Sequence, residues 1–180
     1  MNKEEKPITP LKKILFFGFY TILFFFLFIF INNLNKIQKE ERDKKYIIYK
    51  TDLIDNHPYE YNYTITSNEG VITYHGYSTD EAHDYANDPN SNFLEFNNVK
   101  QLLKNSKIID FVGEEDKAFY NMELNNKDIS KIYEGNSEDK VNKIKLHVNS
   151  DYELIRVELD LSEYFGYQYQ LDLKYEVLYE

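Results

Sequence analysis

The sequence contains no cysteine among its 180 residues. This absence excludes disulfide bonds, thiol catalysis, cysteine-ligated metals and lipid attachment through an N-terminal cysteine. Glycine is scarce, with six residues, and these form no phosphate-binding cluster. No G-x-S-x-G motif occurs, and the histidines are scattered along the chain at His57, His75, His83 and His147. We therefore expect no enzyme activity and no cofactor.

Positive charge is also in short supply, with 21 lysines and arginines against 31 aspartates and glutamates. The formal net charge is −10. The first 45 residues carry an excess of positive charge, so the remaining 135 are more acidic than the chain as a whole. Nucleic-acid binding depends on lysines and arginines that neutralise phosphates, so we expect no nucleic-acid partner.

One long apolar run stands out near the start, from Ile14 to Ile31, with Thr21 as its clearly polar member. At about 1.5 Å per residue, an 18-residue helix spans roughly 27 Å, close to the roughly 30 Å core of a bilayer. A cleaved signal would end in small residues, but "NNLNKIQKEERDKK" follows here. A buried helix of a soluble core would carry a polar stripe, which is lacking. The run predicts an uncleaved transmembrane helix that partners the lipid bilayer.

Basic residues are nearly balanced on the two sides of this run, so their number alone does not decide its orientation. Lys12 and Lys13 adjoin the run, whereas Lys36, the first base on the far side, lies five residues beyond Ile31. We expect a single-pass protein of the cell membrane with a short cytoplasmic tail (1–13), a transmembrane helix (14–31), a solvated juxtamembrane stalk (32–45) and an extracytoplasmic β-rich domain (46–180).

The domain contains segments in which apolar and polar residues alternate. In "YEYNYTITS" (Tyr59–Ser67) the tyrosines fall on one face, and "NEG" then predicts a turn into "VITYHGYS". The end of the chain, Tyr167–Tyr179, alternates in the same way. This period of two is typical of strands with one buried face. Both segments are therefore expected in an antiparallel sheet.

The middle of the domain adds further elements. After a long polar loop (Thr79–Asn92) and a brief strand at Phe93–Phe96, "NNVKQLLKNS" predicts an amphipathic helix. "KIIDFVG" and "KAFYNMEL" predict a hairpin, and "NKDISKIYEG" predicts a second short helix. Two more strands follow, "NKIKLHVN" and "LIRVELDL", the latter with Ile155, Val157, Leu159 and Leu161 inward. The fold class is α+β, mainly antiparallel β: a curved meander sheet, or half-barrel, with two short helices on its concave side.

This order of elements, with "LIRVELDLSEY" as the middle strand of the last three, resembles the LolA/LppX-like half-barrel envelope proteins. The resemblance covers roughly residues 46–180 and rests on strand order and patterning. It implies a role in carrying or sensing lipids or lipoproteins. The chain departs from the family in lacking a lipidated cysteine or cleaved signal and in keeping a transmembrane helix, so free shuttling is not expected.

The tyrosine faces are the candidate ligand-binding surface. Seven tyrosines are expected to line a concave apolar wall with hydroxyls at its rim, suited to an acyl chain or an amphipathic peptide: Tyr59, Tyr61, Tyr63, Tyr167, Tyr169, Tyr175 and Tyr179. The alternative is an ordinary core in which tyrosine replaces phenylalanine. The first hypothesis is thus a membrane-anchored, non-enzymatic module that binds a lipid or another hydrophobic ligand. The second is a structural or interaction subunit of an envelope protein complex with no small ligand.

The polar loop gathers hard oxygen ligands of the kind that Ca²⁺ prefers, at Asp84, Asp88, Asn90 and Asn92. An EF-hand loop that started at Asp88 would need a sharp turn at its sixth position and glutamate at its twelfth. Phe93 and Val99 stand at those positions. We therefore expect a solvated loop and no metal.

Overall fold

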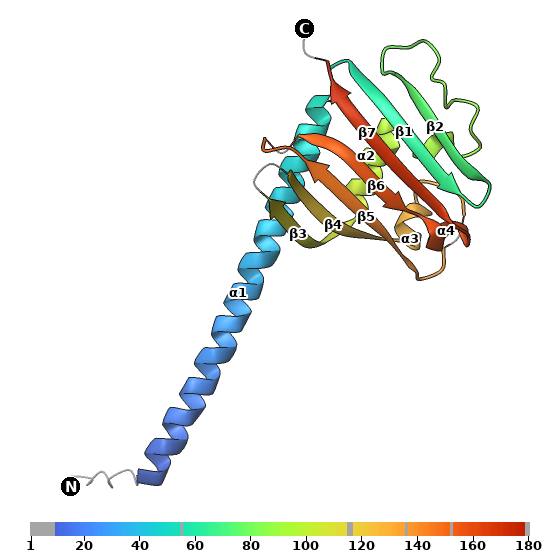
Figure 1. Cartoon of the computed structure of the whole chain (residues 1–180). Helices are drawn as coiled ribbons and strands as arrows, with labels where there is room; N and C mark the ends of the chain where they lie inside the picture. Colours follow the sequence, from blue (N-terminus) through green and yellow to red (C-terminus); the bar gives the residue numbers. More distant parts are fainter. Residues whose placement is uncertain (1–9, 55, 115–116, 136, 152, 179–180) are drawn as a thin grey trace, which may run out of the picture. The chain divides into compact units, whose positions relative to one another are not determined.

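The computed structural model describes residues 10–178 except 55, 115–116, 136 and 152. The chain divides into two compact units, residues 1–42 and 43–180. The first helix, α1 (Pro10–Ile54), begins in the first unit and ends in the second (Figure 1). In the described part of the chain, one helix is long and apolar enough to cross a membrane by its length and composition, over Phe16–Asp52.

Helix α1 is longer than the predicted transmembrane helix and includes the residues expected to form a stalk. Between Phe19 and the helix end at Ile54 the sequence contains neither glycine nor proline, so no helix-breaking residue interrupts this part of α1. A Lys36–Glu40 ion pair (3.7 Å) one turn apart supports the polar part. The last turns, residues 43–54, belong to the second unit, where Ile47 and Thr51 are buried.

The second unit is built on one seven-stranded antiparallel sheet with the order β2-β1-β7-β6-β5-β4-β3 (Figure 1). Its strands are β1 (Tyr59–Ser67), β2 (Gly70–Tyr77), β3 (Lys107–Glu114), β4 (Lys117–Asn125), β5 (Val141–Val148), β6 (Leu154–Asp160) and β7 (Tyr169–Val177). Strands β3 to β7 form a meander, and the β1–β2 hairpin joins it through β1 and β7. The sheet is open, with β2 and β3 at its two edges.

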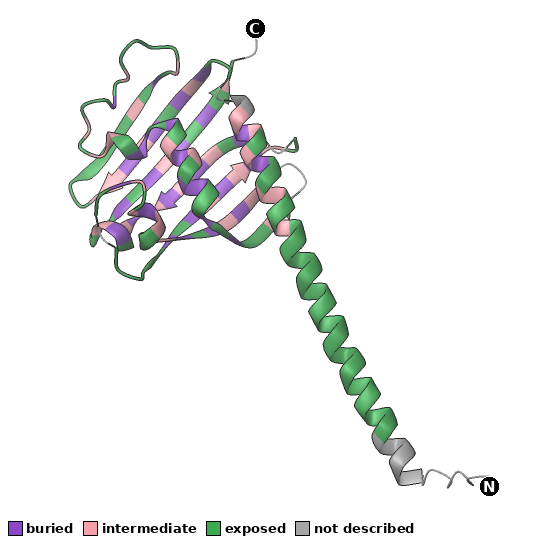
Figure 2. Cartoon of the chain, turned by 180° about the vertical axis from the view of Figure 1, so that it is seen from behind, coloured by how far each residue is buried: buried purple, intermediate pink, exposed green. Residues whose placement is uncertain are grey.

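The helices of this unit lie over one face of the sheet, which we call the covered face (Figure 2). They are the 3₁₀ turn η1 (Ser91–Phe93), α2 (Phe96–Asn105), α3 (Asn126–Ile129) and α4 (Ser162–Phe165), together with the last turns of α1. Lys100 on α2 pairs with Asp52 on α1 (3.0 Å). We call the other side of the sheet the open face.

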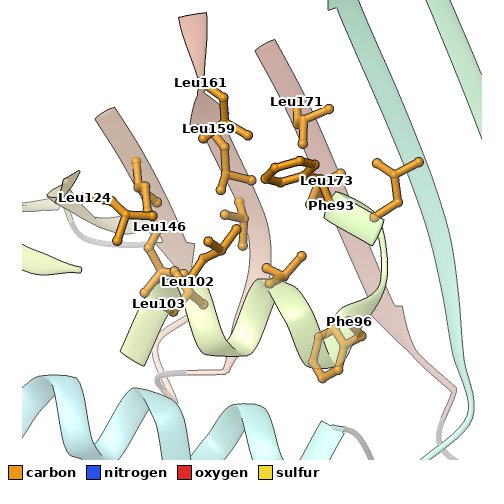
Figure 3. Packing of buried hydrophobic residues seen from close by; sticks show 14 of the residues in the cluster. Phe93, Phe96, Leu102, Leu103, Leu124, Leu146, Leu159, Leu161, Leu171 and Leu173 are labelled. Atoms are coloured by element: carbon orange, nitrogen blue, oxygen red, sulfur yellow. The ribbon is translucent and has the colours of Figure 1, made fainter. Parts of the chain in front are cut away.

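The core lies between α2 and the covered face (Figure 3). Val99 and Leu102 of α2 have no exposed surface, and Leu103 has 2%. These are the residues whose spacing predicts an amphipathic helix, and they face buried leucines of the strands, among them Leu146, Leu159 and Leu173. Apolar burial of this kind is the main force that holds a sheet and its helices together.

The α+β fold with a mainly antiparallel sheet confirms the predicted fold class. Two local predictions were wrong. Phe93–Phe96 is no strand, because η1 ends at Phe93 and α2 begins at Phe96. Ile155 is 40% exposed and Leu154 is buried in its place, because the β5–β6 register shifts between His147 and Val148. One short helix, α4, was not anticipated.

Candidate functional site

The structure brings four of the seven predicted tyrosines into one cluster on the covered face. Tyr61 and Tyr63 stack on each other with ring centroids 4.7 Å apart. Tyr175 of β7 lies 5.6 Å from Tyr63 and 5.8 Å from Tyr59. The register explains the cluster, since Tyr61 pairs directly with Tyr175 across β1 and β7.

Two of the other tyrosines, Tyr167 and Tyr169, lie apart from this cluster. Tyr169 is buried beside Phe165, with ring centroids 4.3 Å apart. Tyr167 precedes β7 and is 43% exposed. Tyr179 lies outside the described residues.

Side chains of the protein itself fill the space in front of the tyrosine cluster. The ring centroid of Phe96 on α2 lies 5.3 Å from that of Tyr59 and 5.1 Å from that of Tyr175. Tyr85 comes from the loop between β2 and η1, and its ring centroid lies 5.4 Å from that of Tyr61 and 5.5 Å from that of Tyr63. The rings of the cluster are thus core residues, and a ligand on this wall would have to displace Phe96 and Tyr85.

Burial keeps the phenols of this core neutral. It raises the pKa values of Tyr63, Tyr85 and Tyr175 far above the ordinary value, because a phenolate loses its hydration when buried. Neighbouring tyrosines raise the pKa of Tyr63 further. These groups are therefore neutral packing residues, and they are poor proton carriers at physiological pH.

Two tyrosine hydroxyls bind the acidic loop, which explains why tyrosine replaces phenylalanine there. The hydroxyl of Tyr61 donates to Asp84 Oδ1 (2.9 Å), and that of Tyr74 donates to Asp88 Oδ2 (2.9 Å). Gly76 leaves room for the first contact, since a Cβ there would lie 2.5 Å from the Tyr61 oxygen. Hydrogen bonds to an ionised group are stronger than neutral ones.

The aspartates of the loop also cap the edge of the sheet. The backbone N–H of His75 donates to Asp84 Oδ2 (2.8 Å), and that of Tyr77 donates to Asp80 Oδ2 (2.8 Å). Both N–H groups belong to β2, which has β1 on its other side. An edge strand presents unpaired N–H groups that attract other strands, and these carboxylates occupy two of them.

These contacts account for the loop residues considered as metal ligands. Asp84 and Asp88 accept the tyrosine hydroxyls, and Asp88 also accepts the N–H of Asn90 (2.7 Å). The carbonyl of Asn92 accepts the hydroxyl of Tyr133 (2.9 Å). Within the described ranges, no three histidine, aspartate or glutamate side chains are placed to hold a metal. Sequence reasoning missed the capping role, whose signal is an aspartate-rich loop directly after a hairpin.

A surface hollow of about 430 Å³ lies between η1, the turn after α3 and α4. Its lining includes Phe93, Tyr133 and Phe165, with Asn90, Asn92 and Glu134 as polar members. Phe93 and Tyr133 stack on each other (3.9 Å, 24°) and are nearly buried. The aromatic faces are therefore engaged with each other, which leaves this hollow a modest candidate for a small ligand.

The open face carries charged side chains in cross-strand pairs. Register places Asp172 opposite Glu158, a like-charge pair that is unfavourable by itself. Arg156 offsets it with two hydrogen bonds to Asp172 (2.6 and 2.9 Å) and a 3.3 Å contact to Glu158. His147 lies 2.8 Å from the same glutamate. Lys145 lies 4.4 Å above the ring of Phe119.

No protein-family model matches the chain, and no match is found among curated proteins. The resemblance to LolA/LppX-like proteins therefore stays a prediction. Three features of the described residues bear on function: the filled covered face, the capped β2 edge and the charged open face.

Proposed function

We propose that this chain is a single-pass protein of the cell membrane whose domain from residue 46 onward lies on the extracytoplasmic side and serves as a non-enzymatic interaction subunit of an envelope protein complex. The observation that carries this proposal is the filled covered face. Phe96 and Tyr85 occupy the wall on which a hydrophobic ligand would lie. Partner binding at the remaining surface needs no such displacement.

The anchor is supported by the exposure of α1. Every residue from Phe16 to Ile31 is exposed, and eight of these side chains are phenylalanine. Exposed apolar surface costs about 25 cal/mol per Å² in water, so a helix of this composition is stable in a bilayer. Lys12 and Lys13 beside the apolar run favour a cytoplasmic N-terminus.

The predicted role in binding a lipid or another hydrophobic ligand is the weaker candidate. Buried tyrosines, Phe96 and the leucines of α2 make the covered face a packed core, and a hydrophobic site needs a cleft that is open to its ligand. The open face remains available to a protein partner, whereas the β2 edge is capped by the aspartates of the loop.

The orientation can be tested on the full chain because it has no cysteine. We expect Val71→Cys, on the exposed part of β2, to react with a membrane-impermeant maleimide in intact cells. Asn2→Cys, in the N-terminal tail, should react after the cells are opened. The reverse pattern would place the domain in the cytoplasm and overturn this part of the proposal.

The interaction role is tested by crosslinking the tagged full chain in native membranes with an amine-reactive reagent, followed by quantitative mass spectrometry. We expect a crosslinked protein in stoichiometric amount. A matched control keeps residues 1–42 and replaces residues 43–180 with an unrelated soluble domain, and it should lose the crosslink. Equal crosslinking of the control, or monomeric full chain alone, would contradict an interaction role for the domain.

A further inference from the structure

The hollow between η1, the turn after α3 and α4 is held in shape by hydrogen bonds between its own walls. The hydroxyl of Tyr133 donates to the carbonyl of Asn92 (2.9 Å), and the hydroxyl of Tyr164 donates to the carbonyl of Tyr133 (3.2 Å). Gly135 allows this close approach, because a Cβ there would collide with the Tyr164 hydroxyl. Helices α3 and α4 lie side by side although they are far apart in the sequence (Figure 1). The hollow is thus formed in advance, which lowers the cost of binding a ligand.

The apolar part of the lining is small. The rings of Phe93 and Tyr133 are stacked on each other and nearly buried. The apolar lining residues with more exposed surface are Pro89, Ile132 and Phe165. An aromatic ring such as that of Phe165 attracts C–H groups to its electron-rich face. This lining suits one face of a small ring.

The polar part of the lining consists of two amides and one carboxylate, from Asn90, Asn92 and Glu134. An amide side chain both donates and accepts hydrogen bonds, whereas a carboxylate accepts them. Asn92 and Glu134 are exposed, so the polar groups of a ligand can reach their side chains. The hollow therefore offers donors and acceptors beside its apolar residues.

This combination distinguishes between classes of ligand. An apolar ligand would leave the amides and the carboxylate without partners. An anion would meet Glu134, and none of the described residues that line the hollow is lysine or arginine. A cation would gain little from one exposed carboxylate. A neutral ring rich in hydroxyl groups can pair with the polar lining and cover the apolar lining with its C–H groups.

We infer that this hollow is a binding site for a neutral saccharide. Its hydroxyls pair with Asn90, Asn92 and Glu134, and its ring lies against Ile132 and Phe165. The volume of about 430 Å³ falls within the roughly 300–1,000 Å³ of small-molecule sites. The polar contacts come from surface side chains, so we expect weak binding, with a dissociation constant on the order of 1 mM.

The test is saturation-transfer difference NMR on the full chain in nanodiscs, with empty nanodiscs as the background. Chitotriose and maltotriose are the neutral probes, and trigalacturonate is the anionic probe. We expect saturation transfer to a neutral probe and none to trigalacturonate, because Glu134 repels the anion.

Substitutions in the lining locate the contact. Asn92→Ala removes the amide and keeps the carbonyl that accepts the Tyr133 hydroxyl, and Glu134→Ala removes the carboxylate. Each should weaken binding about threefold to tenfold, as expected for the loss of one hydrogen bond. The matched control is Asn62→Ala, an exposed amide on the open face of β1, which should bind like the parent. Thermal unfolding should be unchanged in all three variants, because these side chains are exposed.

Absence of transfer to both neutral probes would overturn the assignment, as would equal transfer to trigalacturonate. Binding by Asn92→Ala and Glu134→Ala equal to that of the parent would place the contact elsewhere and would overturn it as well. None of these results changes the stoichiometric partner expected from amine crosslinking, so a failed saccharide site is distinct from a failed interaction role.

Discussion

The covered face and the open face belong to the same seven strands but are stabilised differently. On the covered face, tyrosines and leucines are nearly free of solvent contact and pack against α2. On the open face, charged side chains balance one another while remaining in contact with water. A large buried side chain contributes about 2–5 kcal/mol to the free energy of unfolding, whereas an exposed ion pair contributes about 0–1 kcal/mol. Fold stability therefore resides on the covered face, which leaves the open face available to partners.

The largest effect is expected at alkaline pH, where the buried tyrosines of the covered face make the folded chain unstable. Burial raises the pKa values of Tyr63 and Tyr175 above the ordinary 10.0. The unfolded chain ionises them near pH 10 and the folded chain does not, so their stabilisation is complete below pH 10 and is lost as the pH rises above it. Each such tyrosine lowers the free energy of unfolding by about 1.4 kcal/mol per pH unit in that range.

Absorbance at 295 nm and near-ultraviolet circular dichroism check this prediction on the full chain in detergent. The buried phenols should ionise only as the tertiary signal disappears, and Tyr63→Phe should move the transition to higher pH. Ionisation of all phenols near pH 10 with an unchanged tertiary signal would contradict a filled covered face.

A second comparison takes one residue from the buried core and one from the exposed β3 edge. Leu102→Ala on α2 should lower the free energy of unfolding by about 3–4 kcal/mol, because it leaves a cavity in a site with no exposed surface. Ile109→Ala, at the exposed β3 edge, should cost less than about 1 kcal/mol. Urea denaturation measures both changes, and equal costs would show that the two regions do not differ as described.

The third contrast concerns polar groups. Asn142 of β5 is buried, donates to Asn126 Oδ1 (2.6 Å) and accepts the N–H of Tyr164 (3.1 Å). Asn142→Leu should cost about 2–3 kcal/mol, because its partners are left without hydrogen bonds. Asn121→Leu, on the open side of β4, should cost less than about 0.5 kcal/mol. Similar urea midpoints for the two variants would refute the role of this buried pair.

The fourth contrast isolates the tyrosine hydroxyls. Tyr61→Phe removes the bond to Asp84 and should cost about 1–2 kcal/mol, whereas Tyr167→Phe on the surface should be neutral within about 0.5 kcal/mol. A double-mutant cycle with Asp84→Asn should show coupling between the two sites. Additive effects would mean that the loop is held by other contacts.

The smallest effect is expected on the open face. Arg156→Met breaks the contacts to Asp172 and Glu158, yet should cost less than about 1 kcal/mol because the arginine is 36% exposed. Added salt should reduce the difference further. A loss above 2 kcal/mol would show that the open face is part of the stabilising structure.

Sequence patterns predicted the elements of the fold well. Alternation in "YEYNYTITS" identifies β1 and its buried face, and the spacing of Val99, Leu102 and Leu103 identifies α2. The place of Ile155 was not predictable, because the bulge beside His147 arises from pairing between β5 and β6. Strand periodicity depends on the chain itself, whereas a register shift depends on the neighbouring strand.

The candidate site was less predictable than the fold. Alternation shows that Tyr61 and Tyr63 face inward, but it does not show that Phe96 and Tyr85 cover them. These covering residues come from elements more than twenty positions away, so their placement depends on tertiary packing. The same holds for Asp80 and Asp84, which read as a solvated loop in sequence and cap the β2 edge in the structure.

The most direct test of a filled covered face uses a photoreactive fatty acid in nanodiscs that contain the full chain. After illumination, peptide mapping should find adducts on the apolar stretch Phe16–Ile31, and none on the peptides that carry Tyr61, Tyr63 and Tyr175. Adducts on those tyrosine peptides, reduced by competition with unlabelled fatty acid, would show that an acyl chain reaches the covered face and would contradict the account.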